Sequence, residues 1–164
     1  MWLRGIQSKC MTWFADLSPC NYFSSDDSRF RAVGWLTRGK SFITGEVSEE
    51  VFEKLCQLLI NPWNPVYPGG SHHCELCRFT GGTGVGQFKG FTVAGTSAAS
   101  LFVPGDGIIY VAPSSIAHYI DAHAYQPPDE FCQAVLNCPP MRSVQYFKAL
   151  LANGGRELVK GAAT

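Results

Sequence analysis

The chain has 164 residues, 46% of them hydrophobic, and its 13 Lys and Arg residues balance its 13 Asp and Glu residues. This length suits a single domain with its own core, and the balanced charge disfavours a nucleic-acid binder, which needs a basic face. No apolar run is long enough to cross a membrane and no secretion signal opens the sequence, so we expect a cytoplasmic protein without a membrane partner.

The first predicted elements are a pair of strands and a helix. The stretch 31–47 (RAVGWLTRGKSFITGEV) predicts two short strands around a turn at residues 38–39. The stretch 48–62 (SEEVFEKLCQLLINP) predicts a helix, because Ser48 suits the N-cap and the apolar residues that follow have helical spacing. Pro62 ends this helix.

The second half of the chain predicts strands followed by helices. Residues 88–112 alternate β-favouring runs with Gly and Pro, which is typical of short strands. Amphipathic patterns then predict helices within 113–125, 127–140 and 142–155. The predicted fold class is α+β: a small antiparallel β-sheet with one preceding helix, about three C-terminal helices and a zinc-knuckle-like element.

The predicted domain organisation is simple. We expect residues 1–10 to be an N-terminal extension, residues 11–155 to form a single α+β domain, and residues 156–164 to be a frayed tail. The chain contains seven cysteines. An odd number of cysteines in a cytoplasmic protein disfavours a framework of disulfides.

All four histidines lie in two short clusters, and one of these clusters adjoins a C-x-x-C motif. The first cluster is SHHCELC and the second is HYIDAH. Tetrahedral zinc takes four Cys or His ligands, and short spacings place two of them on one side of the ion. The alternative is a chance C-x-x-C beside histidines with structural roles. The predicted zinc ligands are Cys74, Cys77, His118 and His123, with His72 in reserve.

The spacing of the second pair raises a geometric difficulty. Residues five apart on a straight helix lie about 140° apart around its axis. His118 and His123 therefore cannot both point towards one ion from a regular helix. Either the helix loosens near Ala122, or His72 or His73 replaces one of the two.

A closed Cys2His2 site favours a structural zinc. A catalytic zinc would keep three protein ligands and a water molecule, and Glu75 or Asp121 would be the acid or base. The HCE triplet matches half of the deaminase signature, but the downstream P-C-x-x-C half is missing. A redox dithiol is disfavoured because glycines, and not a helix, follow the C-x-x-C.

The blocks MTWFADLSPCNYF, HHCELC and HYIDAHAYQPP resemble an uncharacterised bacterial family of short proteins. Its members share a G-x-H-x-C-x-x-C block and an HYI-x-x-H-x-Y-x-P-P block. The resemblance covers the chain from Met11 to about Gly155, and the histidine of the first block falls on His72. The family has no assigned activity, so the resemblance implies a zinc knuckle and no substrate.

From these patterns we expect a small zinc-stabilised protein that is not an enzyme and that binds another protein, as an accessory or immunity-type factor. One alternative is a zinc-dependent hydrolase-like enzyme with Cys74, Cys77 and one histidine as ligands. A second alternative is a nucleic-acid-binding zinc module, which predicts a basic face around Arg78 and Lys89.

Overall fold

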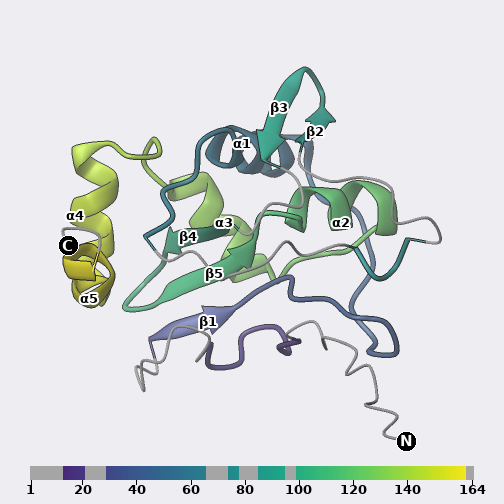
Figure 1. Cartoon of the computed structure of the whole chain (residues 1–164), viewed down its shortest axis with the longest axis horizontal. Helices are drawn as coiled ribbons and strands as arrows, with labels where there is room; N and C mark the ends of the chain where they lie inside the picture. Colours follow the sequence, from purple (N-terminus) through teal and green to yellow (C-terminus); the bar gives the residue numbers. More distant parts are fainter. Residues whose placement is uncertain (1–12, 21–28, 66–73, 78–84, 95–98, 162–164) are drawn as a thin grey trace, which may run out of the picture.

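The fold is α+β, as predicted, with two small sheets and five helices in the part of the chain that is described. The computed structural model describes residues 13–20, 29–65, 74–77, 85–94 and 99–161 (Figure 1). The predicted extension at residues 1–10 lies outside these ranges and stays a prediction. Within them, no helix combines the length and apolar character needed to span a bilayer.

The larger sheet has three strands in the order β1-β5-β4. Strands β4 (Ser100–Pro104) and β5 (Ile109–Pro113) pair antiparallel, and all their residues are buried. Strand β1 (Phe30–Ala32) pairs parallel with β5, with Phe30 opposite Ile109. The sheet is therefore mixed, and the prediction of a purely antiparallel sheet is wrong for β1.

The smaller sheet is a hairpin of β2 (Val85–Phe88) and β3 (Phe91–Ala94). Its turn residues, Lys89 and Gly90, both have positive φ, at 46° and 84°. Such a two-residue turn matches the right-handed twist of the strands. The hairpin packs beside helix α1 (Glu49–Leu59), as Figure 1 shows.

Helix α1 is the element that the sequence predicted best. The Ser48 hydroxyl accepts a hydrogen bond from the amide of Val51, which satisfies one of the amides that the first turn leaves without a helical partner. The helix buries one apolar face that includes Leu55 and Leu59. It ends at Leu59, before Pro62.

Four helices follow the strands, where about three were predicted. They are α2 (Ile116–His123), α3 (Asp129–Asn137), α4 (Val144–Ala152) and α5 (Arg156–Gly161). The fourth, α5, replaces most of the predicted frayed tail. It forms because Leu158 is buried and the helix packs against α4.

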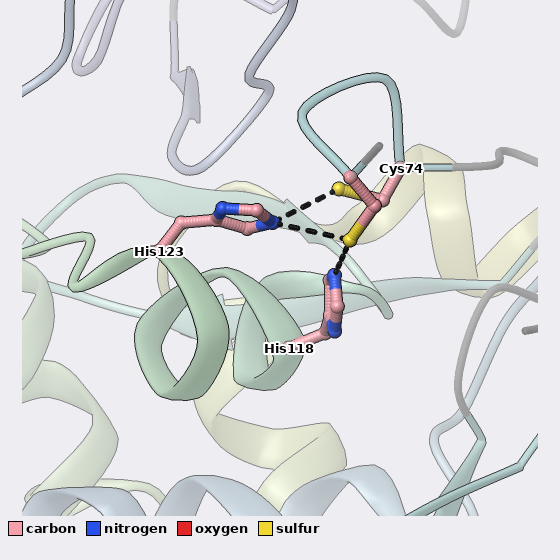
Figure 2. Close-up of side chains that lie close together, drawn as sticks. Cys74, His118 and His123 are labelled. Atoms are coloured by element: carbon pink, nitrogen blue, oxygen red, sulfur yellow. Dashed lines mark hydrogen bonds between the residues drawn. The ribbon is translucent and has the colours of Figure 1, made fainter. Parts of the chain in front are cut away.

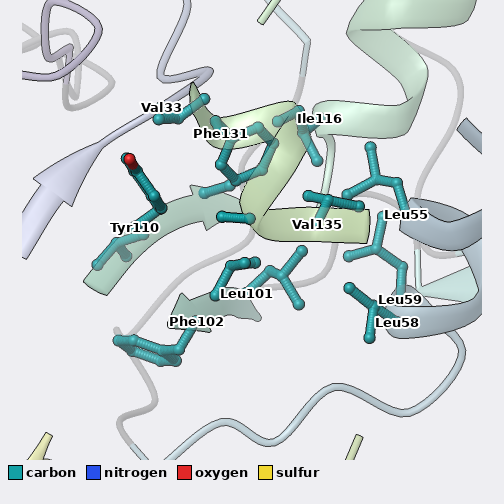
Figure 3. Close-up of a cluster of buried hydrophobic side chains, with 14 of the residues drawn as sticks. Val33, Leu55, Leu58, Leu59, Leu101, Phe102, Tyr110, Ile116, Phe131 and Val135 are labelled. Carbon is teal, nitrogen blue, oxygen red and sulfur yellow. The ribbon is translucent and has the colours of Figure 1, made fainter. Parts of the chain in front are cut away.

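The core lies around α3, between the larger sheet and α1 (Figure 3). Phe131 and Val135 of α3 are completely buried. Burial of each such side chain stabilises the fold by about 1.5–3 kcal/mol. Helix α4 joins this core through Tyr146, whose hydroxyl donates to the carbonyl of Phe102 at 2.7 Å.

Residues 33–47 do not form the predicted strand pair. Only the preceding residues Phe30–Ala32 are a strand, and the chain then runs irregularly to Ser48. Val33 N donates to Val111 O of β5 at 3.0 Å. The later backbone partners lie at the end of α2: Gly45 N donates to Ala124 O at 3.0 Å, and Gln126 N donates to Ile43 O at 2.9 Å. These contacts place the segment beside the helix that carries His118 and His123.

Candidate metal centre

Two cysteines and two histidines from distant parts of the sequence lie together in the structure (Figure 2). Cys74 and Cys77 belong to the short loop 74–77, and His118 and His123 belong to α2. One ligand atom from each side chain lies within 4.8 Å of each of the others. The four side chains predicted as ligands are thus brought together, and the group could hold a metal ion.

The distances between sulfur and nitrogen atoms match those around a tetrahedral ion. Cys74 Sγ and Cys77 Sγ lie 3.3 and 3.4 Å from His123 Nε2, and Cys77 Sγ lies 3.3 Å from His118 Nε2. Zinc bonds to sulfur and nitrogen at their usual lengths, set at a tetrahedral angle, separate the two atoms by about 3.6 Å. The observed pairs are within a few tenths of an ångström of that value, so the donor set fits zinc.

The geometric difficulty of the H-x4-H spacing is resolved by where the helix ends. Helix α2 stays regular through Ala122 and His123, so it does not loosen where expected. Ala124 then leaves the helix with φ 52°. Helical side chains lean towards the N-terminus, so the imidazole of His123 can reach back over the turn that carries His118. The two ring centroids are 5.2 Å apart. His72 and His73 lie outside the described residues.

Burial changes the ionisation of the cluster. Cys74 is only 7% exposed, whereas the other three side chains are half-buried. Burial, reinforced by His123, lowers the pKa of His118, although Asp121 opposes this shift. The neutral imidazole has the lone pair that a metal needs. Burial also raises the pKa of Cys74, and a divalent cation beside the sulfur would favour the thiolate.

Glu75 connects the loop of the two cysteines to residues 37–38. Its carboxylate oxygen Oε2 accepts from Thr37 Oγ1 at 2.5 Å and from the backbone amide of Arg38 at 3.3 Å. The Arg38 side chain also donates a hydrogen bond, from Nε to the backbone carbonyl of Glu75 at 3.0 Å. The sequence indicated Glu75 only as a possible base, and these hydrogen-bond partners were not predicted. No spacing or motif in the sequence links two irregular segments in this way.

Asp121, the other residue considered as an acid or base, lies exposed on α2. It lines a shallow pocket of about 350 Å³ together with residues of α1 and of the segment before it. Lys89 also lines this pocket, and its ammonium lies 2.6 Å from Glu49. None of the four clustered Cys and His side chains lines the pocket. Asp121 therefore lines a pocket that the cluster does not line, although its charge still acts on His118.

Comparison with known proteins identifies one relationship. A family model described as a domain of unknown function (DUF7919) matches residues 12–136. The matched region contains all four clustered side chains, whereas α4 and α5 lie beyond it. No curated protein and no solved structure matches the chain.

Proposed function

The chain belongs to the DUF7919 family, a domain of unknown function, so we propose its role from its own structure, beginning with the candidate metal centre. The protein binds one zinc ion through Cys74, Cys77, His118 and His123, and the ion holds the 74–77 loop against α2. The single observation that supports this proposal is the set of sulfur–nitrogen distances of 3.3–3.4 Å among the four side chains.

The composition of the donor set supports zinc. Two thiolates carry two negative charges and two neutral imidazoles carry none, so a divalent ion makes the centre neutral. Thiolate and imidazole together suit zinc, whereas magnesium and calcium prefer oxygen ligands. Cys56, Cys132 and Cys138 carry thiols and form no disulfide, which supports a reducing compartment such as the cytoplasm.

The geometry favours a structural ion over the hydrolase-like alternative. Four protein donors fill a tetrahedral coordination sphere, and a catalytic site must leave one position for water. His118 or His123 would have to withdraw to open that position. Glu75 is also a poor candidate for a base, because Thr37 and Arg38 already hydrogen-bond to its carboxylate.

A protein partner is supported by apolar side chains on the surface of α4. Val144 and Leu151 are 66% and 46% exposed, and their spacing of seven residues places them on one face of the helix. A nucleic-acid partner has less support, because Lys89 is paired with Glu49. Arg78, the other basic residue considered, lies outside the described residues. We therefore assign the protein a zinc-stabilised, non-enzymatic binding role.

The proposal is tested on protein purified without chelators. Metal analysis should find about one zinc per chain, and X-ray absorption at the zinc edge should show two sulfur and two nitrogen neighbours. Cys77→Ser should lose the zinc, whereas Cys132→Ser should retain it. Protein that binds no zinc would contradict the proposal. Three protein ligands with one water on the ion would favour the hydrolase-like alternative.

A further inference from the structure

Residues 37–46, which we call the 37–46 segment, connect the two elements that carry the clustered cysteines and histidines. At one end, Thr37 and Arg38 hydrogen-bond to Glu75 in the cysteine loop. At the other end, Gly45 hydrogen-bonds to Ala124, the residue directly after His123. The segment therefore spans the same two elements that a bound ion would join.

The second end of the segment is held independently of the cysteine loop. Gly45 N donates a hydrogen bond to Ala124 O, and the neighbouring residues Thr44 and Tyr125 form a β-bridge. The ring of Phe42 also packs edge-on against the buried ring of Tyr125, with centroids 6.1 Å apart. Backbone and core contacts thus fix residues 42–45 to the end of α2.

The first end depends on the position of Glu75. Residues 38–41 are exposed, so core packing does not hold them. Lys40 Nζ lies 4.7 Å above the ring of Trp13, but a cation–π contact at an exposed site is weak. Glu75 stands between Cys74 and Cys77, so two sulfurs bound to one ion would fix its backbone. Hydrogen bonds to its carboxylate are charge-assisted and hence the stronger contacts of this end.

We propose that metal binding at the centre orders residues 37–40 through Glu75, whereas residues 42–45 stay attached to α2 with or without metal. This inference rests on the proposed function, because it needs the ion that the four side chains would bind. The exposed turn that contains Arg38 and Lys40 then has one fixed shape only in the loaded protein. Glu75 is a positioning residue in this arrangement, and metal loading changes the surface at residues 37–40.

The test compares amide hydrogen exchange in zinc-loaded and chelated full-length protein, resolved by NMR. The four probes are the amides of Arg38, Lys40, Gly45 and Gln126, whose acceptors are Glu75 Oε2, Thr37 O, Ala124 O and Ile43 O. Chelation should speed exchange at Arg38 and Lys40 by about tenfold or more beyond any change at Gly45 and Gln126. Global unfolding would instead speed all four alike.

Variants then separate Glu75 from the metal itself. Glu75→Ala should speed exchange at Lys40 in the zinc-loaded protein, although the acceptor of the Lys40 amide is unchanged. Thr37→Val, which removes only the hydroxyl donor, should act in the same direction and lies outside the cysteine loop. Asp121→Asn is the matched control: it removes a carboxylate two residues from His123 and should change none of the four rates.

Zinc content is measured on the same samples, so the two proposals fail in different ways. Protein without zinc overturns the proposed function and this inference together. If the Lys40 amide exchanges at the wild-type rate in both zinc-loaded variants, Glu75→Ala and Thr37→Val, only the inference is overturned. Chelation that speeds all four amides equally also overturns it, because residues 37–40 would then open no more readily than residues 42–45.

Discussion

The hydroxyl of Tyr125 lies 2.9 Å from both carboxylate oxygens of Asp16, across 109 positions of the sequence. The backbone amide of Gly34 donates to the same carboxylate at 2.9 Å. Asp16 thus joins three segments: residues 13–20, the irregular residues directly after β1, and the end of α2. Tyr125 follows His123 by two residues, so this junction lies at the C-terminal end of the helix that carries His118 and His123.

Removal of this hydroxyl should destabilise the protein more than removal of a hydroxyl bound to a neutral acceptor. Tyr125→Phe loses a hydrogen bond to a carboxylate, worth about 1.5–3 kcal/mol. Tyr146→Phe is the control, because Tyr146 is equally buried and donates to the neutral carbonyl of Phe102. Its expected cost is about 1 kcal/mol. Urea unfolding measures the loss of unfolding free energy in each variant. Equal losses would show that the carboxylate of Asp16 does not strengthen the hydrogen bond of Tyr125.

Loss of the metal should lower stability because the proposed ion binds only the folded chain. With free zinc about 1,000-fold above its dissociation constant, chelation or Cys74→Ser should cost about 4 kcal/mol of unfolding free energy. Thermal unfolding with and without chelator measures this effect. Cys132→Ser should keep the full response to chelator. A Cys74→Ser protein that chelator still destabilises would show that the stabilising ion lies elsewhere.

The cysteines should differ in their reactivity. Burial raises the pKa of Cys138 to about 12 and that of Cys56 to about 11, so both remain thiols at pH 8. Only thiolates react rapidly with alkylating agents. Pulse alkylation of native protein, read by peptide mass spectrometry, should leave Cys56 and Cys138 unlabelled. Cys77, which is part-exposed, should become labelled only after chelation. Rapid labelling of Cys138 would refute its burial.

Two glycines with positive φ should differ in their tolerance of alanine. A Cβ at Gly34 would lie 3.1 Å from two carbons of Ile116, whereas a Cβ at Gly39 would have no atom within 4 Å. Both positions have φ near +80°, so both variants carry the left-handed penalty of about 1–2 kcal/mol. Gly34→Ala should cost more, because Ile116 is buried and cannot move freely. Chemical denaturation measures the unfolding free energy of both variants. Equal losses would contradict the close packing of Gly34 against Ile116.

Local patterns in the sequence predicted the elements that depend on local interactions. Ser48 and the apolar stripe after it were sufficient to place α1, because an N-cap and helical spacing act within a few residues. The cysteine and histidine clusters were likewise visible as short spacings. The structure brings them together because the loop 74–77 and α2 lie side by side, which no spacing within either cluster encodes.

The elements that were missed depend on long-range contacts. Strand β1 has three residues, too few for a period to be recognised, and its parallel partner β5 lies about eighty residues further on. Residues 33–47 have β-favouring side chains, but in the described structure only the backbone of Val33 bonds to a strand, at Val111 of β5, whereas Ile43 and Gly45 bond to the end of α2. Helix α5 was predicted as a frayed tail because its short pattern does not reveal that Leu158 is buried.

The aromatic contact between α4 and the core has a practical consequence for work on this family. The family match ends at residue 136, inside α3, yet Trp63 packs against the rings of Tyr146 and Phe147 on α4. A recombinant fragment cut at the family boundary would leave Trp63 and Phe102 without their covering helix. The region that the family model matches is therefore smaller than the packed unit, and an expression fragment of this protein should include α4 and the helix α5 that packs against it.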